Sequence, residues 1–222
     1  MQRPFCKKSK DITQALGPFK KGLRPITPFN MPSKKDKTPI LPDRYYHIFN
    51  RGNNFENVFK KEKDYFLFLG LLRKHLCPIT QICAYALLPN HFHILLKTNE
   101  DLYKNQFSKE YSKLICYYTL LVNKREGRSG SLFLNPFKRI LIENDDYLKR
   151  LVFYIHFNPQ KHKIVRRYQT YKFSSYRAYT YDCETAVNTK EVIEMFGSIG
   201  NFYDYHDYFE ELDKLKKYSL ED

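Results

Sequence analysis

The sequence predicts an α+β domain built on an antiparallel sheet. Short runs of aromatic and branched residues alternate with longer leucine-rich runs, in the order β-α-β-β-α-β and then a further helix. Apolar residues make up 42% of the 222-residue chain, enough for one hydrophobic core. This order is the ferredoxin-like arrangement, an antiparallel sheet with helices on one face. Additional helices are expected at the C-terminal end.

Four segments have strand composition. They are residues 44–51, 80–88, 91–98 and 131–143. Only Pro89 and Asn90 separate the second from the third, so a hairpin is expected to join them. The fourth is expected to be interrupted at Asn135-Pro136, because proline cannot donate to a sheet ladder.

The predicted helices are residues 63–76, 101–123, 144–159, 189–196 and 202–217. The helix at 144–159 has the clearest period, an apolar stripe formed by Leu148, Leu151, Val152 and Ile155. Asn144, or an aspartate just after it, is expected to cap its start. Pro159 disfavours helical geometry at Asn158 and is expected to end it.

The chain divides into three predicted regions. Residues 1–42 hold seven of the eleven prolines and ten Lys or Arg against two acids, a net charge of 10 − 2 = +8. We expect them to form a flexible basic arm, which either tracks a phosphate backbone or is simply a solvated tail. Residues 43–182 are the predicted main domain, and 183–222 a helical extension.

Charge and cysteine content narrow the class of protein. The chain carries 38 Lys and Arg against 24 Asp and Glu, a net charge of +14, which favours a nucleic acid as partner. Its five cysteines are odd in number and include no C-x2-C pair, so a disulfide framework or zinc knuckle is not expected. No secretory signal or membrane-spanning run is visible, and we expect a reducing, cytoplasmic compartment.

The segment ALLPNHFHILLK places two histidines within a predicted strand. His91 and His93 project to the same face, because side chains on a strand alternate. Two imidazoles on one face can bind a single divalent cation. The pair alone is more often structural, so a third ligand and a reacting group are needed to support a metal site.

The helix at 144–159 can supply both. Tyr154 and Asn158 are four residues apart and therefore lie on one helix face. The Asn158 amide oxygen can bind a hard cation, and the Tyr154 phenol can lie beside the same cation. Taken singly, Tyr154 is more simply an ordinary helix tyrosine, and Asn158 is more simply a residue that ends the helix.

Several blocks, taken together, resemble a known family. YYHIFNRGNN, AYALLPNHFHILLK, LFLNPFKRILIENDDYLKRLVFYIHFNPQKHKIV and YKFSSYRAY resemble successive blocks of the REP-associated tyrosine transposases, which are single-tyrosine members of the HUH nuclease superfamily. The blocks run from about residue 44 to residue 180. The chain has Gln160-Lys161 after NP, where the family commonly has a small or hydrophobic residue, and Phe173 where it commonly has tryptophan.

The resemblance implies an enzyme and a site. His91 and His93 match the paired histidines that hold Mg²⁺ or Mn²⁺, Tyr154 matches the nucleophile, and Asn158 matches a polar third ligand. The implied reaction cleaves and rejoins single-stranded DNA near a hairpin through a 5′-phosphotyrosine, by a monomer or a homodimer. Two alternatives stay open: a DNA-binding protein that has lost cleavage, and a phosphodiesterase that uses water.

Basic and polar residues near these blocks are candidate DNA contacts. They are Arg51, Asn53, Asn54, Lys138, Arg139, Lys161, Lys163, Arg166 and Arg167. Gly52 would permit close backbone approach. Phe173 or Tyr176 could stack on unpaired bases. For each of these basic and polar residues, a solvated surface position is the alternative.

Overall fold

A computed structural model of the chain describes residues 38–181 and 185–218, with side chains described as far as residue 213. All of these residues belong to one compact unit. The expected basic arm, apart from its last few residues, lies outside the described part, as do Cys6 and Cys183. Among the residues that are described, no helix combines the length and apolarity needed to cross a membrane.

Four antiparallel strands form one sheet in the order β2-β3-β1-β4. The strands are β1 (Tyr45–Arg51), β2 (Thr80–Leu88), β3 (His91–Thr98) and β4 (Lys138–Ile142). The predicted β2–β3 hairpin is therefore confirmed with its two-residue turn. Strand β3 is an inner strand, paired on both sides, and this pairing limits its movement.

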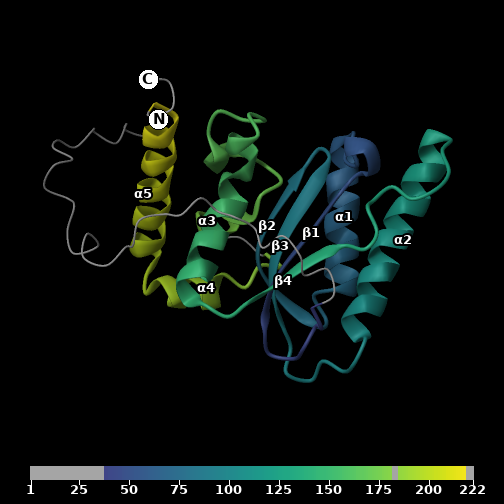
Figure 1. Ribbon diagram of the computed structural model, residues 1–222, viewed down its shortest axis with the longest axis horizontal. Coiled ribbons are helices and arrows are strands. Elements are labelled where there is room, and N and C mark those ends of the chain that lie inside the picture. The colour runs from purple at the N-terminus through teal and green to yellow at the C-terminus, as the bar shows by residue number, and fades with distance from the viewer. Residues whose placement is uncertain (1–37, 182–184, 219–222) are drawn as a thin grey trace, which may run out of the picture. The chain divides into compact units, whose positions relative to one another are not determined.

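Helices cover both faces of this sheet (Figure 1). They are α1 (Glu62–His75), α2 (Gln106–Glu126), α3 (Asp145–Lys161), α4 (Thr189–Phe196) and α5 (Ile199–Tyr218). Helices α1 and α2 lie together on one face, as the ferredoxin-like order predicts. Helix α3 covers the other face, and the C-terminal helices pack against it.

One local prediction is confirmed and another is wrong. The fourth predicted strand, over 131–143, is interrupted at Asn135-Pro136 as expected, because proline has no N–H for the ladder, and the regular strand β4 begins at Lys138. Helix α3 does not end at Asn158 but continues through Pro159 to Lys161. A proline in the last turn removes only one N–H donor, and the next turn still closes through the His162 amide, which donates to the Asn158 carbonyl.

Candidate active site

The two histidines of β3 lie side by side on the sheet face that α3 covers. Their ring centroids are 5.2 Å apart and their planes nearly perpendicular. In the pairing with β1, Arg51 lies opposite His91 and Phe49 opposite His93. On the other side, Ala86 of β2 lies opposite His93. The small alanine side chain leaves room for α3 to approach the imidazoles.

A third imidazole, which sequence reasoning missed, supports the pair. His47 of β1 is fully buried, and its Nε2 lies 2.9 Å from Nδ1 of His93. A hydrogen bond at Nδ1 holds the ring and directs the Nε2 atom of His93 away from His47, as outer partners of metal-binding histidines do. The sequence could have indicated this neighbour, because the alternation of side chains along paired strands puts His47 and His93 on the same sheet face.

His91 is oriented by its neighbour in the hairpin turn. Its Nδ1 donates to the Asn90 Oδ1 at 2.7 Å, which leaves the Nε2 lone pair available. Burial lowers the pKa of His91 to about 4, with a further lowering by His162 and Arg51. Burial also lowers the pKa of His47 to about 3 and that of His93 well below its ordinary value. These imidazoles are therefore neutral near pH 7, the form that binds metals.

Helix α3 brings Tyr154 to the histidines. Asn144 caps the helix, since its Oδ1 accepts a hydrogen bond from the Tyr147 amide at 2.9 Å. The four residues of the predicted apolar stripe are buried, which fixes the rotation of the helix about its axis. The Tyr154 ring then lies edge-on to His93, with centroids 5.6 Å apart. Burial raises the pKa of Tyr154, while a hydrogen bond with the Asn158 side chain partly lowers it.

Asn158 is the polar residue one turn beyond the tyrosine, and it is fully buried. Its Nδ2 donates to the Tyr154 carbonyl at 2.8 Å, whereas its Oδ1 has no partner among the described residues. A buried, unpaired amide oxygen is costly unless a ligand or ion binds it. Nowhere in 38–181 or 185–213 do three His, Cys, Asp or Glu side chains gather as a metal site. A cation here would therefore take two imidazoles and this amide, with water or substrate completing its shell.

The opposite side of α3 is held by a buried relay of hydrogen bonds. His206 Nδ1 donates to the Phe202 carbonyl at 2.8 Å, so its Nε2 accepts from His156 Nδ1 at 3.0 Å. His156 Nε2 then accepts from the Ser175 hydroxyl at 2.9 Å. The Ser175 oxygen accepts from the Tyr85 amide of β2 at 2.8 Å. The relay joins α5, α3 and the sheet, and so fixes the helix that carries Tyr154.

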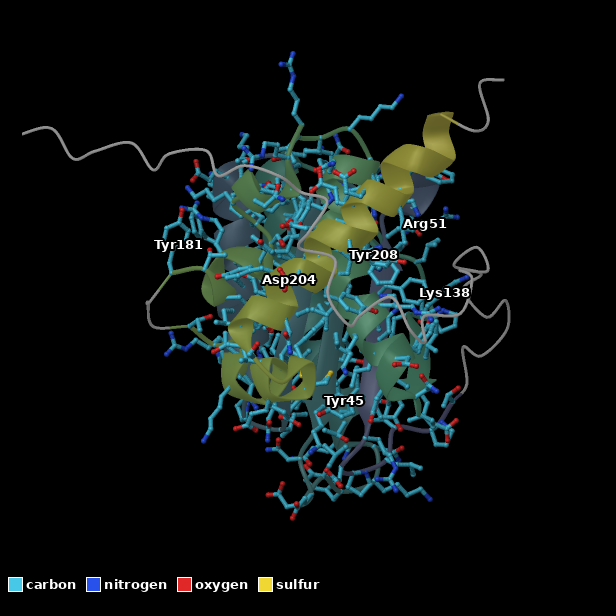
Figure 2. The ribbon with its side chains drawn as sticks, turned by 90° about the vertical axis from the view of Figure 1, so that its left-hand side faces the viewer. Tyr45, Arg51, Lys138, Tyr181, Asp204 and Tyr208 are labelled. Atoms are coloured by element: carbon cyan, nitrogen blue, oxygen red, sulfur yellow. The ribbon has the colours of Figure 1, made fainter. Side chains whose placement is uncertain are left out.

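The predicted DNA contacts separate into groups. Arg51 and Lys138 are exposed on the histidine face at the same end of β1 and β4 (Figure 2). Arg139 points to the opposite face, because strand residues alternate, and its guanidinium lies over the Phe137 ring. The side-chain amide of Asn53 donates a hydrogen bond from Nδ2 to the Ser131 carbonyl at 2.9 Å.

Lys161 is the basic residue that reaches the candidate nucleophile. Its Nζ lies 4.9 Å from the centroid of the Tyr154 ring. His162, which was not predicted, packs its ring against His91 with centroids 4.9 Å apart. Lys163, Arg166 and Arg167 follow in an exposed run. The end of α3 therefore concentrates positive charge beside the imidazoles.

The two aromatic residues suggested as base-stacking platforms are packed into the protein. Tyr176 is buried beside His156 and Tyr168. Phe173 stacks on Tyr65 with centroids 3.8 Å apart and is only partly accessible. The stacking role suggested for Tyr176 is therefore wrong, because its ring is buried beside α3, whereas Phe173 packs with one face on Tyr65 of α1.

Comparisons with known proteins bear on the fold. No family model matches the sequence, and no curated protein matches it. Among solved structures, the chain is similar to one described as a REP-associated tyrosine transposase bound to a REP hairpin, with 18% identity and a TM-score of 0.54. The match covers 71% of this chain and 93% of the other. At this identity the likeness shows a shared fold and nothing more.

Proposed function

We propose that the protein is a metal-dependent, single-tyrosine transposase that cleaves and rejoins single-stranded DNA beside a hairpin. The observation that carries the proposal is the contact of Tyr154 with His93, with the unpaired Oδ1 of Asn158 buried one turn away. The basic residues at the end of α3 and the fold of a hairpin-bound transposase support DNA as the substrate. The cytoplasm, in association with DNA, remains the expected compartment.

The proposed chemistry is phosphoryl transfer to tyrosine. The Tyr154 oxygen attacks a backbone phosphorus, the bond from phosphorus to the 3′ oxygen breaks, and the phenolic proton ends on the released 3′-OH. The product is a 5′-phosphotyrosine, which conserves the bond energy, so that a second 3′-OH can attack it and restore the free tyrosine. A divalent cation, Mg²⁺ or Mn²⁺, would polarise the phosphate when bound.

The chain's own residues would each have a part. His91, His93 and Asn158 would hold the cation, while Asn90 and His47 orient the two imidazoles. Lys161 adds positive charge where the phosphate would lie. The buried relay behind α3 would keep the tyrosine at a constant position, which is what positioned nucleophiles require.

A covalent trapping experiment tests the proposal. The protein is incubated with labelled hairpin DNA carrying single-stranded tails and Mn²⁺, denatured, and examined for a protein–DNA band. We expect a band with the wild type and with Tyr147→Phe, which changes a tyrosine on the same helix, and none with Tyr154→Phe.

Each other outcome identifies a rival. A band that persists in Tyr154→Phe shows that the nucleophile is another residue. Cleavage without any band indicates a phosphodiesterase that uses water. Binding without cleavage indicates a DNA-binding protein on the same fold.

A further inference from the structure

An exposed aromatic residue lies in the turn that follows β1. Phe55 is 65% exposed, although most large aromatic residues of the described part are buried. The Arg51 guanidinium carbon lies 4.1 Å from the centroid of its ring. A planar cation on an aromatic ring forms a stack that can extend to a third flat group.

The turn holds this ring in a conformation that is unfavourable by itself. Asn54 and Phe55 both have left-handed backbone angles, with φ of 51° and 59°. A β carbon at Gly52 would lie 2.2 Å from the Glu56 carbonyl oxygen, so only glycine fits there. Strain of this kind persists where the surrounding structure enforces it, and it is concentrated at functional sites.

Hydrogen bonds fasten the turn to the hairpin that begins β3. The Gly52 amide donates to the Asn90 carbonyl at 2.8 Å, and the Val58 amide donates to the Pro89 carbonyl at 2.7 Å. The residue after Asn90 is His91, and Arg51 is the direct strand partner of His91. The exposed ring is thus on a rigid support beside the candidate metal ligands.

We propose that Phe55 and Arg51 form a stacking platform for an unpaired base of single-stranded DNA, next to the phosphate that is cleaved. This inference rests on the proposed function. A π face accepts any base, so the platform would order the strand without reading its sequence. The Arg51 guanidinium would contact the adjoining phosphate as well as the ring.

Fluorescence of a base analogue tests the platform directly. Hairpins are prepared with a single-stranded thymidine tail that carries 2-aminopurine at successive positions. We expect wild-type protein and Phe55→Tyr to quench the fluorescence at one tail position, and Phe55→Leu to quench at none. For unlabelled DNA we expect Phe55→Leu to weaken binding about tenfold, and to have little effect when that position is abasic.

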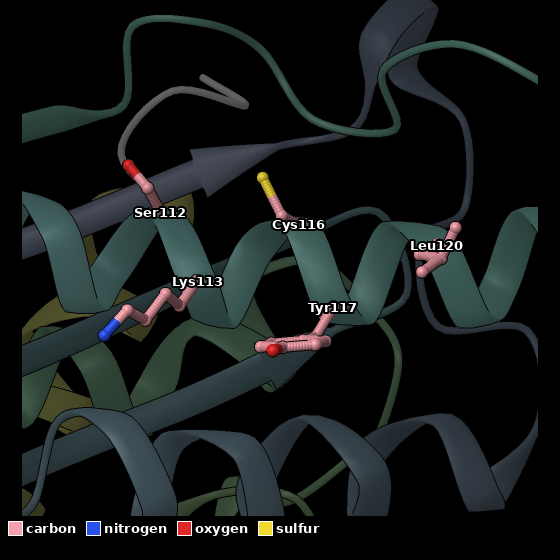
Figure 3. Close-up of a pocket in the computed structure, with 5 residues that line it drawn as sticks. All are labelled: Ser112, Lys113, Cys116, Tyr117 and Leu120. Atoms are coloured by element: carbon pink, nitrogen blue, oxygen red, sulfur yellow. The ribbon is translucent and has the colours of Figure 1, made fainter.

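A matched control uses another exposed aromatic residue with a cation on its ring. Tyr117 of α2 is 49% exposed, and the Lys74 Nζ lies 5.9 Å from its ring centroid. It lines a shallow apolar pocket with Ser112, Lys113, Cys116 and Leu120 on the far side of the sheet (Figure 3). We expect Tyr117→Leu to leave both quenching and affinity unchanged.

The outcomes separate this inference from the proposed function. Unchanged quenching in Phe55→Leu, equal loss in Tyr117→Leu, or no quenching at any position overturns the platform, even if the covalent band forms. Quenching that depends on Phe55 without a covalent band supports the platform and contradicts only the transposase.

Discussion

The two faces of the sheet differ in chemistry. The face covered by α1 and α2 buries mainly aromatic and aliphatic side chains: Phe68 is fully buried, with its ring centroid 4.9 Å from that of Phe92 and 5.4 Å from that of Tyr118. The face covered by α3 buries imidazoles and an amide, among them His47, His93 and Asn158, instead.

The difference indicates that the α1–α2 face mainly stabilises the fold and that the α3 face carries the candidate site. Burial of apolar rings stabilises a fold by about 25 cal/mol per Å², whereas buried polar groups cost free energy unless they are paired. On the α3 face, His47 Nδ1 and Asn158 Oδ1 lack partners among the described residues. A cation or substrate that bound the Asn158 oxygen would offset its part of this cost.

Loss of a core ring on the α1–α2 face should have the largest effect. We expect Phe68→Ala to lower the free energy of unfolding by about 3–5 kcal/mol, because it leaves a cavity among packed rings. Urea unfolding measures it. Phe66→Ala on the same helix, at a position 53% exposed, should cost less than about 0.5 kcal/mol. A similar cost for both would contradict the assignment of Phe68 to the core.

Removal of the third imidazole should weaken the candidate metal site. We expect His47→Phe to reduce Mn²⁺ affinity about 10- to 100-fold, because Nδ1 of His93 loses its partner. Titration calorimetry measures it. His75→Phe is the matched control, since His75 is a buried histidine on the other face, bonded to Glu110. Equal losses in the two variants would remove the proposed role of His47.

Breaking the relay behind α3 should have an effect of about 1–3 kcal/mol on unfolding. His206→Phe leaves the Nδ1 donor of His156 buried without an acceptor. Thermal or urea unfolding measures the loss. Tyr208→Ala, two residues along α5 at a position 38% exposed, should be nearly neutral. A neutral His206→Phe would show that the relay does not hold the helix.

The smallest effect concerns an ion pair at the start of α1, and it depends on pH. Burial raises the pKa of Asp64, but hydrogen bonds from Arg125 and two backbone amides outweigh it, so that the pKa is lowered overall. A lowered folded-state pKa stabilises the protein above the unfolded value of about 4, and this stabilisation is lost as the pH falls through the folded value.

We therefore expect Asp64→Asn to cost about 1 kcal/mol near neutral pH. The difference from wild type should shrink as the pH falls below the unfolded value of about 4. Unfolding free energies measured across this range test it. Glu62→Gln, whose partner Lys172 is exposed, should show almost no difference. A pH-independent cost for Asp64→Asn would contradict the charge-based explanation.

Local patterns predicted much of the architecture. The hairpin over 80–98 was predictable because two apolar runs flank a two-residue turn. The rotation of α3 about its axis was predictable because its single apolar stripe must face the core. The end of α3 was not predictable, since the cost of one lost N–H depends on the next turn. The interruption before β4 was predictable, because Pro136 has no N–H to donate to the ladder.

The candidate site shows the same division. Chain periodicity alone places His91 and His93 on one strand face and Tyr154 and Asn158 on one helix face. The meeting of these two faces and the position of His47 behind His93 depend on tertiary packing. These are contacts between residues distant in the chain, set by strand order and packing, which no local pattern encodes.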